Sequence, residues 1–184
     1  MPRSRRTVQR SSRGFTLIEL LAVVVITAVL SLLAVAGFRR HMQSTRGTEA
    51  VAVILAIRSA EEAYMAENHQ YLNVSTDDKS WYPRTKPDAQ RVSFSTTQGD
   101  YLLWNQLAPS IKESVRFSYL VNAGIGGTVI PPLTELKAGP DLSATQPLDW
   151  YMIQAKGDVD GNGVFSHYAS SSMTGELYVE NEGE

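Results

Sequence analysis

The chain has 184 residues, with 17 Lys and Arg against 19 Asp and Glu, and a formal net charge of −2. This near-balance argues against a nucleic-acid binder that relies on bulk charge. Cysteine is absent, which excludes disulfides, thiolate metal sites, a catalytic thiol and a lipid-modified cysteine. The sequence has no Gly-x-Ser-x-Gly, no P-loop and no His-Glu-x-x-His, so we do not expect an enzyme.

The N-terminus joins a basic leader to a long apolar run. Residues 1–14 contain five arginines and no acid, so the rest of the chain carries a formal charge of about −7. The apolar run covers 15–38, and Glu19 is its only charged residue. From Leu20 to Phe38 it is close to the roughly 20 residues that cross a hydrocarbon core. Because basic flanks stay in the cytoplasm, we expect a single-pass segment with a cytoplasmic N-terminus.

One interpretation of this run is an ordinary secretory signal peptide. The small residues at Ala34 and Ala36 would allow cleavage after Ala36, which would release a secreted calcium- or ligand-binding module. The run is longer than the usual apolar core of about 7–15 residues. Neither this interpretation nor a plain anchor explains Glu19, because a charge near the bilayer costs on the order of 2–3 kcal/mol.

A second interpretation accounts for the acid. Together with the leader and the apolar run, the residues Gly14-Phe15-Thr16-Leu17-Ile18-Glu19-Leu20 resemble the processing signature of type IV prepilins and type II secretion pseudopilins. The resemblance implies cleavage after Gly14 by a prepilin peptidase, N-methylation of Phe15, and a role for Glu19 in assembly. A free amine and a carboxylate are each costly when buried alone. Pairing of Glu19 with the Phe15 amine of a neighbouring subunit would therefore set the register.

The resemblance also implies where such a chain acts and what it meets. It implies a structural subunit that polymerises with itself or with other pilins. An inner-membrane assembly platform would be a further partner. The precursor would sit in the bacterial inner membrane before it enters a pilus or a periplasmic pseudopilus. The resemblance does not say whether the chain is a major or a minor subunit. It also does not choose among motility, adhesion, DNA uptake and protein secretion as the role of the filament.

Helical spacing continues beyond the apolar run. Apolar residues recur every three or four positions in 47–68: Ala50, Val53, Ile57, Ala60 and Tyr64. Charged residues fall mostly off this stripe: Glu49, Arg58, Glu61 and Glu62. We expect one helix from about Thr16 to about Asn68, in which residues 39–68 form an amphipathic continuation packed on a sheet.

Residues 69–184 are predicted to form a sheet domain. Two segments, 69–100 and the proline-rich 131–149, are expected to be loops. A short helix is expected at Tyr101–Leu107, and alternation predicts a half-buried strand from Val115 to Val121. Three further strands are expected: Trp150–Ala155, Val164–Tyr168 and Glu176–Val179. One helix and an antiparallel meander of about four strands make an α+β fold, which is also the pilin-like arrangement.

An acidic turn lies between two of these strands. Asp158, Asp160 and Asn162 alternate and precede a glycine, as in the first half of an EF-hand calcium loop, but Ala169 stands at the twelfth position. One interpretation is a tight hairpin turn. The other is a calcium site, which the resemblance allows because certain pseudopilins are held by calcium. Further ligands would be backbone carbonyls or the side chains of Ser166, Glu176 and Glu180. No other cofactor and no nucleic acid is expected.

Overall fold

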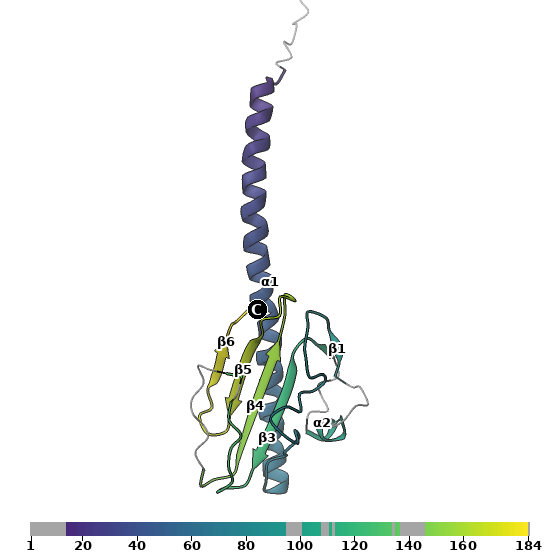
Figure 1. The fold of residues 1–184 in the computed structure, drawn as a ribbon, viewed down its shortest axis with the longest axis vertical. Helices are drawn as coiled ribbons and strands as arrows, with labels where there is room; N and C mark the ends of the chain where they lie inside the picture. Colours follow the sequence, from purple (N-terminus) through teal and green to yellow (C-terminus); the bar gives the residue numbers. More distant parts are fainter. Residues whose placement is uncertain are drawn as a thin grey trace, which may run out of the picture. The chain divides into compact units, whose positions relative to one another are not determined.

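The computed structural model describes residues 14–94, 101–107, 111, 113–133, 135–136 and 146–183, which excludes the predicted leader up to residue 13 (Figure 1). The chain divides into two compact units, Met1–Arg39 and Arg40–Glu184. The helices are α1 (Leu17–Asn68) and α2 (Tyr101–Leu107). The strands are β1 (Val92–Ser93), β2 (Ser114–Val115), β3 (Ser118–Gly124), β4 (Trp150–Gly157), β5 (Ser166–Ser171) and β6 (Leu177–Glu180).

The long helix α1 confirms the expected element almost to the residue. No proline falls between Pro2 and Pro83, so every interior residue of α1 keeps its backbone donor. Its first part, Leu17–Val35, has a mean hydropathy of 2.7 and is long and apolar enough to cross a membrane. The helix continues without a break through residues 34–37, where the signal-peptide interpretation places its cut.

The main sheet is an antiparallel meander with the strand order β3-β4-β5-β6 (Figure 1). One row of side chains crosses it on a single face: Tyr119 lies opposite Ala155, Ala155 opposite Tyr168, and Tyr168 opposite Val179. The predicted α+β fold with about four antiparallel strands is therefore confirmed. The three C-terminal strands differ from prediction only at their ends.

The predicted strand from Val115 to Val121 is wrong as a single element. β2 ends at Val115, β3 begins at Ser118, and Arg116 and Phe117 separate the two. The Arg116 N–H donates to Glu49 Oε1 at 2.7 Å, and its guanidinium donates to Oε2 at 3.1 Å. Because the Arg116 amide bonds to a side chain on α1, it does not join a strand ladder, and β2 pairs instead with β1.

The loop before α2 covers the outer edge of β3. Ser75 N–H donates to Val121 O at 2.8 Å, and Tyr82 N–H donates to Tyr119 O at 2.9 Å. The centroid of the Tyr82 ring lies 5.4 Å from that of Trp104 of α2, on which it stacks, and the Tyr82 hydroxyl donates to Phe94 O. The segment predicted to be an irregular loop thus contains β1 and closes a sheet edge that would otherwise expose unpaired backbone groups.

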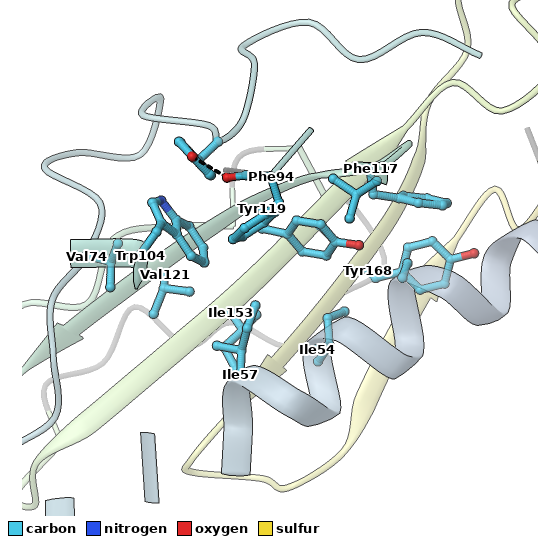
Figure 2. Packing of buried hydrophobic residues seen from close by; sticks show 14 of the residues in the cluster. Ile54, Ile57, Val74, Phe94, Trp104, Phe117, Tyr119, Val121, Ile153 and Tyr168 are labelled. Carbon is cyan, nitrogen blue, oxygen red and sulfur yellow. Dashed lines mark hydrogen bonds between the residues drawn. The ribbon is translucent and has the colours of Figure 1, made fainter. Parts of the chain in front are cut away.

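One face of α1 packs on the sheet, but its phase differs from the predicted stripe. The buried positions of α1 are Gly47, Ala50, Ile54, Ile57 and Glu61. Figure 2 shows Ile54 and Ile57 directed at Ile153 of β4 and the neighbouring sheet residues. Val53, Ala60 and Tyr64 are only half-buried, and Glu61, predicted to lie off the stripe, is completely buried.

The opposite face of the sheet is covered as well. A second apolar cluster contains Ile130, Trp150 and Met152, with Leu133 and Met173 packed against it. Trp150 and Met152 alternate along β4 with Tyr151 and Ile153 of the first cluster, so they lie on the other face. All eight residues of β4 are buried, and β3 is buried on both faces as far as Asn122. The half-buried character predicted for β3 is therefore wrong.

Candidate functional site

The start of α1 is fixed by a reciprocal pair of side chains. Thr16 N–H and Thr16 Oγ1 donate to Glu19 Oε2 at 2.9 and 2.8 Å, and Glu19 N–H donates to Thr16 Oγ1 at 3.3 Å. Thr16 thus takes the N-cap position and Glu19 the third helical position, which is a capping box. Glu19 has a local role in helix initiation, and the Thr-x-x-Glu spacing that reveals it was readable in the sequence.

The predicted cleavage site lies just before this capping box. Gly14, Phe15 and Thr16 have no regular secondary structure, and α1 begins at Leu17. Phe15 is 82% exposed, and no atom of another described segment lies within 4 Å of where a Cβ on Gly14 would stand. A bond in exposed, irregular backbone is accessible to a peptidase. Cleavage there would leave both Thr16 and Glu19 on the mature chain.

The helix after the capping box exposes an apolar surface on all sides. The large apolar side chains from Leu17 to Val35 are between 53% and 77% exposed. Soluble monomers rarely expose contiguous apolar patches of more than a few hundred Å². This surface therefore requires lipid or other apolar helices around it. Gly14, Phe15 and Glu19, the three residues that the sequence predicts for processing and assembly, lie at and just before the start of this helix.

A comparison with known protein families also identifies the N-terminal motif. Residues 9–35 match the family described as the prokaryotic N-terminal methylation motif. The match includes the predicted cut, Phe15, Glu19 and most of the apolar run, so the resemblance noted from residues 14–20 is confirmed. The alternative of ordinary signal-peptide cleavage after Ala36 is not favoured.

Curated relatives are of two kinds. The chain is 30% identical over 73 residues to a fimbrial protein of Pseudomonas aeruginosa, covering 40% of this chain and 47% of that protein. It is 37% identical over 59 residues to the type II secretion system core protein G of Escherichia coli K12, covering 32% of this chain and 41% of the relative. The core protein G of Pectobacterium carotovorum is 33% identical over 78 residues, or 42% and 49% of the two chains.

These relationships are partial in length. The chain spans about half or less of the length of the curated relatives it matches. No solved structure matches it significantly.

In the acidic turn between β4 and β5, side-chain oxygens accept hydrogen bonds from backbone N–H groups of the same turn. Asp158 Oδ1 accepts hydrogen bonds from the N–H groups of Gly161 at 2.7 Å and Asn162 at 3.1 Å, and Oδ2 accepts one from Gly163 at 3.0 Å. Asp160 Oδ1 accepts from Asn162 N–H at 3.1 Å, and Asn162 Oδ1 accepts from Val164 N–H at 2.7 Å. These bonds form a hydrogen-bonded turn between the two strands.

The remoter candidates for calcium binding are engaged elsewhere. Ser166 is buried, and its hydroxyl donates to Asn181 O at 2.7 Å. Glu176 Oε2 accepts the Tyr178 hydroxyl at 2.9 Å, and Glu180 lies opposite His167 in the sheet register. In the part of the chain that the structure describes, no group of three or more His, Asp or Glu gathers to hold a metal. Calcium binding stays a prediction.

Proposed function

We propose that this chain is a structural subunit of a pilus-like or pseudopilus filament. The observation that carries the proposal is a methylation motif whose acid, Glu19, sits at the start of an exposed apolar helix. Similarity to both a fimbrial protein and a type II secretion protein supports a filament subunit and leaves both kinds of machine open. The role is one of packing rather than catalysis.

Processing would create the group that Glu19 requires. Cleavage after Gly14 leaves a new amine on Phe15, with a reference pKa of about 8, which methylation keeps basic. In a bundle of such helices that excludes water, an unpaired amine and an unpaired carboxylate are both strongly unfavourable. The Glu19 of one subunit would meet the Phe15 amine of another, and every other stagger would leave both charges buried alone.

The same helix would serve two environments in turn. Before assembly, the five arginines of the leader would hold the N-terminus in the cytoplasm while the apolar segment spans the inner membrane. After cleavage by a prepilin peptidase, an inner-membrane platform would transfer the helix from lipid into the filament interior. The apolar surface stays covered throughout, because neighbouring helices replace acyl chains.

The decisive variant is Glu19→Gln, because it separates charge from capping. Glutamine also serves in a capping box, so the start of α1 is kept while the carboxylate is lost. Without its partner the Phe15 amine is buried unpaired, at a cost of about 3–5 kcal/mol per subunit. We expect the yield of sheared surface or overexpressed periplasmic filaments to fall below detection, with the chain still present in the membrane.

Thr16→Ala is the matched control. It removes the cap, at about 0.5–2 kcal/mol of helix stability, and leaves the Glu19 charge in place. We expect filaments close to wild-type yield. If Glu19→Gln assembles as well as wild type while Thr16→Ala does not, Glu19 acts as a helix cap alone, and the charge-pairing role is wrong.

A further inference from the structure

Glu61 is a carboxylate buried in the interface between α1 and the sheet. Its side chain is fully buried on the same stripe of α1 as Ile54 and Ile57. Oε2 accepts a hydrogen bond from the backbone N–H of Leu72 at 3.0 Å. Oε1 is buried without a hydrogen-bond partner. A carboxyl group in such a place is tolerated when it is neutral, because an ionised oxygen without a partner costs several kcal/mol.

The charged and titratable groups around Glu61 do not neutralise it. Glu62 and Arg58 lie near it on α1, and Tyr71 faces it from the segment after the helix. Tyr151 of β4 interacts with Arg58 and Glu62. Asp149, which directly precedes β4, carries a negative charge that raises the pKa of Tyr71. The Arg58 guanidinium donates to Gly175 O at 2.9 Å. Among the described residues, no Lys, Arg or His forms an ion pair with Glu61.

The contact between Glu61 and Leu72 joins the end of α1 to the edge of the sheet. Leu72 lies four residues beyond Asn68, where α1 ends. Three residues later, Ser75 N–H donates to Val121 O at 2.8 Å, and Val121 N–H donates to Ser75 Oγ at 3.1 Å. The segment 69–75 is thus bonded to Glu61 at Leu72 and to β3 at Asn73, which accepts a hydrogen bond from Ala123 N–H at 3.1 Å, and at Ser75.

We propose that Glu61 is a pH-sensitive latch: the neutral carboxyl holds segment 69–75 against the end of α1, and its ionisation releases that segment. The latch lies within the second unit and does not depend on filament assembly. In the neutral form the carboxyl keeps its acceptor bond to the Leu72 N–H with no buried charge. Ionisation strengthens the bond from the Leu72 N–H, but it leaves charge on the buried Oε1, which has no partner. That charge draws water into the apolar interface, and the end of α1 separates from the segment that follows it.

The direction of the pH dependence follows from the burial. Burial raises the pKa of Glu61 from its ordinary 4.5 to about 7, and the Glu62 charge adds to this while the Leu72 N–H opposes it. Between these two values the unfolded chain releases the proton and the folded chain retains it. Stability from this group is therefore greatest below pH 4.5, falls as the pH rises, and is lost above pH 7. Over this range the loss raises the equilibrium constant for unfolding by a factor on the order of 100.

The test compares Glu61→Gln with Glu62→Gln in the full chain in detergent micelles. Glutamine at 61 keeps an acceptor for the Leu72 N–H and does not titrate. For wild type and Glu62→Gln, thermal and denaturant unfolding at pH 5 to 8 should show decreasing stability with rising pH. Hydrogen exchange at the Leu72 amide, corrected for intrinsic pH dependence, should accelerate over the same range. For Glu61→Gln both pH dependences should be much reduced.

A second measurement keeps the test decisive if Glu61→Gln does not fold. NMR titration of the Glu61 side-chain carboxyl in the wild-type chain should give a midpoint well above 4.5. A midpoint near 4.5 would overturn the proposal. So would a Glu61→Gln variant that folds and keeps the wild-type pH dependence of stability and of Leu72 exchange.

Discussion

The hydroxyl of Tyr168 lies where a side chain at Gly47 would stand. A Cβ on Gly47 would be 2.7 Å from Tyr168 Oη, closer than real Cβ contacts. Burial and the nearby Glu182 raise the pKa of Tyr168 to about 12, so the ring stays neutral against the helix. Glycine inside a helix costs about 0.5–1 kcal/mol relative to alanine. The close approach of helix and sheet explains why glycine occupies this position.

Gly47→Ala should therefore destabilise the sheet domain although alanine favours helix. We expect the free energy of unfolding to fall by about 1–3 kcal/mol, because the tyrosine must shift in a packed interface. Gly37→Ala is the control, since Gly37 has no atom of another segment within 4 Å of where a Cβ would stand. Denaturant unfolding of the domain should be unchanged by Gly37→Ala. A Gly47→Ala variant as stable as wild type would contradict this account of the contact.

Residue-level detail was only partly predictable from the sequence. The fixed spacing within residues 14–20 predicts Gly14, Phe15 and Glu19 as processing and assembly residues, and these roles stay predictions. The phase of the buried stripe was not predictable, because two sets of positions fit helical spacing in this segment. The predicted set, Ala50, Val53, Ile57, Ala60 and Tyr64, excludes Glu61. Contact with the sheet selects the other set, and a single sequence does not contain that contact.

The turn between β4 and β5 is held by one carboxylate. Asp158 accepts three backbone N–H groups and is 7% exposed. Asp158→Ala leaves those donors without their acceptor, so we expect a loss of about 1–3 kcal/mol in the free energy of unfolding. Asp160→Ala removes bonds in an exposed part of the turn and should cost less. Denaturant unfolding in the presence of a calcium chelator measures both.

The same variants test the calcium site predicted from the sequence. The hairpin interpretation predicts no calcium-dependent heat and no thermal shift in wild type. A shift in wild type that Asp158→Ala abolishes would support calcium instead. If Asp158→Ala and Asp160→Ala are equally harmless in chelator, the hydrogen-bonded turn is not what stabilises this connection.

Elements with a long, regular pattern were predicted well. α1 and α2 begin and end within a residue or so of the expected positions, and β4, β5 and β6 differ by at most three residues at either end. β1 was missed because two residues are too short to show alternation. β2 and β3 were merged because the alternation continues through Arg116 and Phe117, while the bonds to Glu49 that break the ladder come from α1.

At the scale of the molecule, the two units divide the features of the proposed filament subunit. Met1–Arg39 carries the basic leader, the predicted cleavage site and the exposed apolar helix, and Arg40–Glu184 carries the core and the sheet. The proposed N-terminal processing was predictable from the sequence because its motif is local. The sequence does not predict whether the chain serves a pilus or a secretion system. That choice depends on the surface of the sheet domain, where this sequence has no comparable motif.

The most direct test is the N-terminus of the mature protein. Intact mass and sequencing of the N-terminal peptide, from native membranes and from sheared or periplasmic filaments, would give the cut and the modification together. The account predicts a chain that begins at methylated Phe15 and retains the whole apolar helix. A mature chain that begins at Gly37 would have lost Glu19 and the assembly helix, and would contradict the filament function.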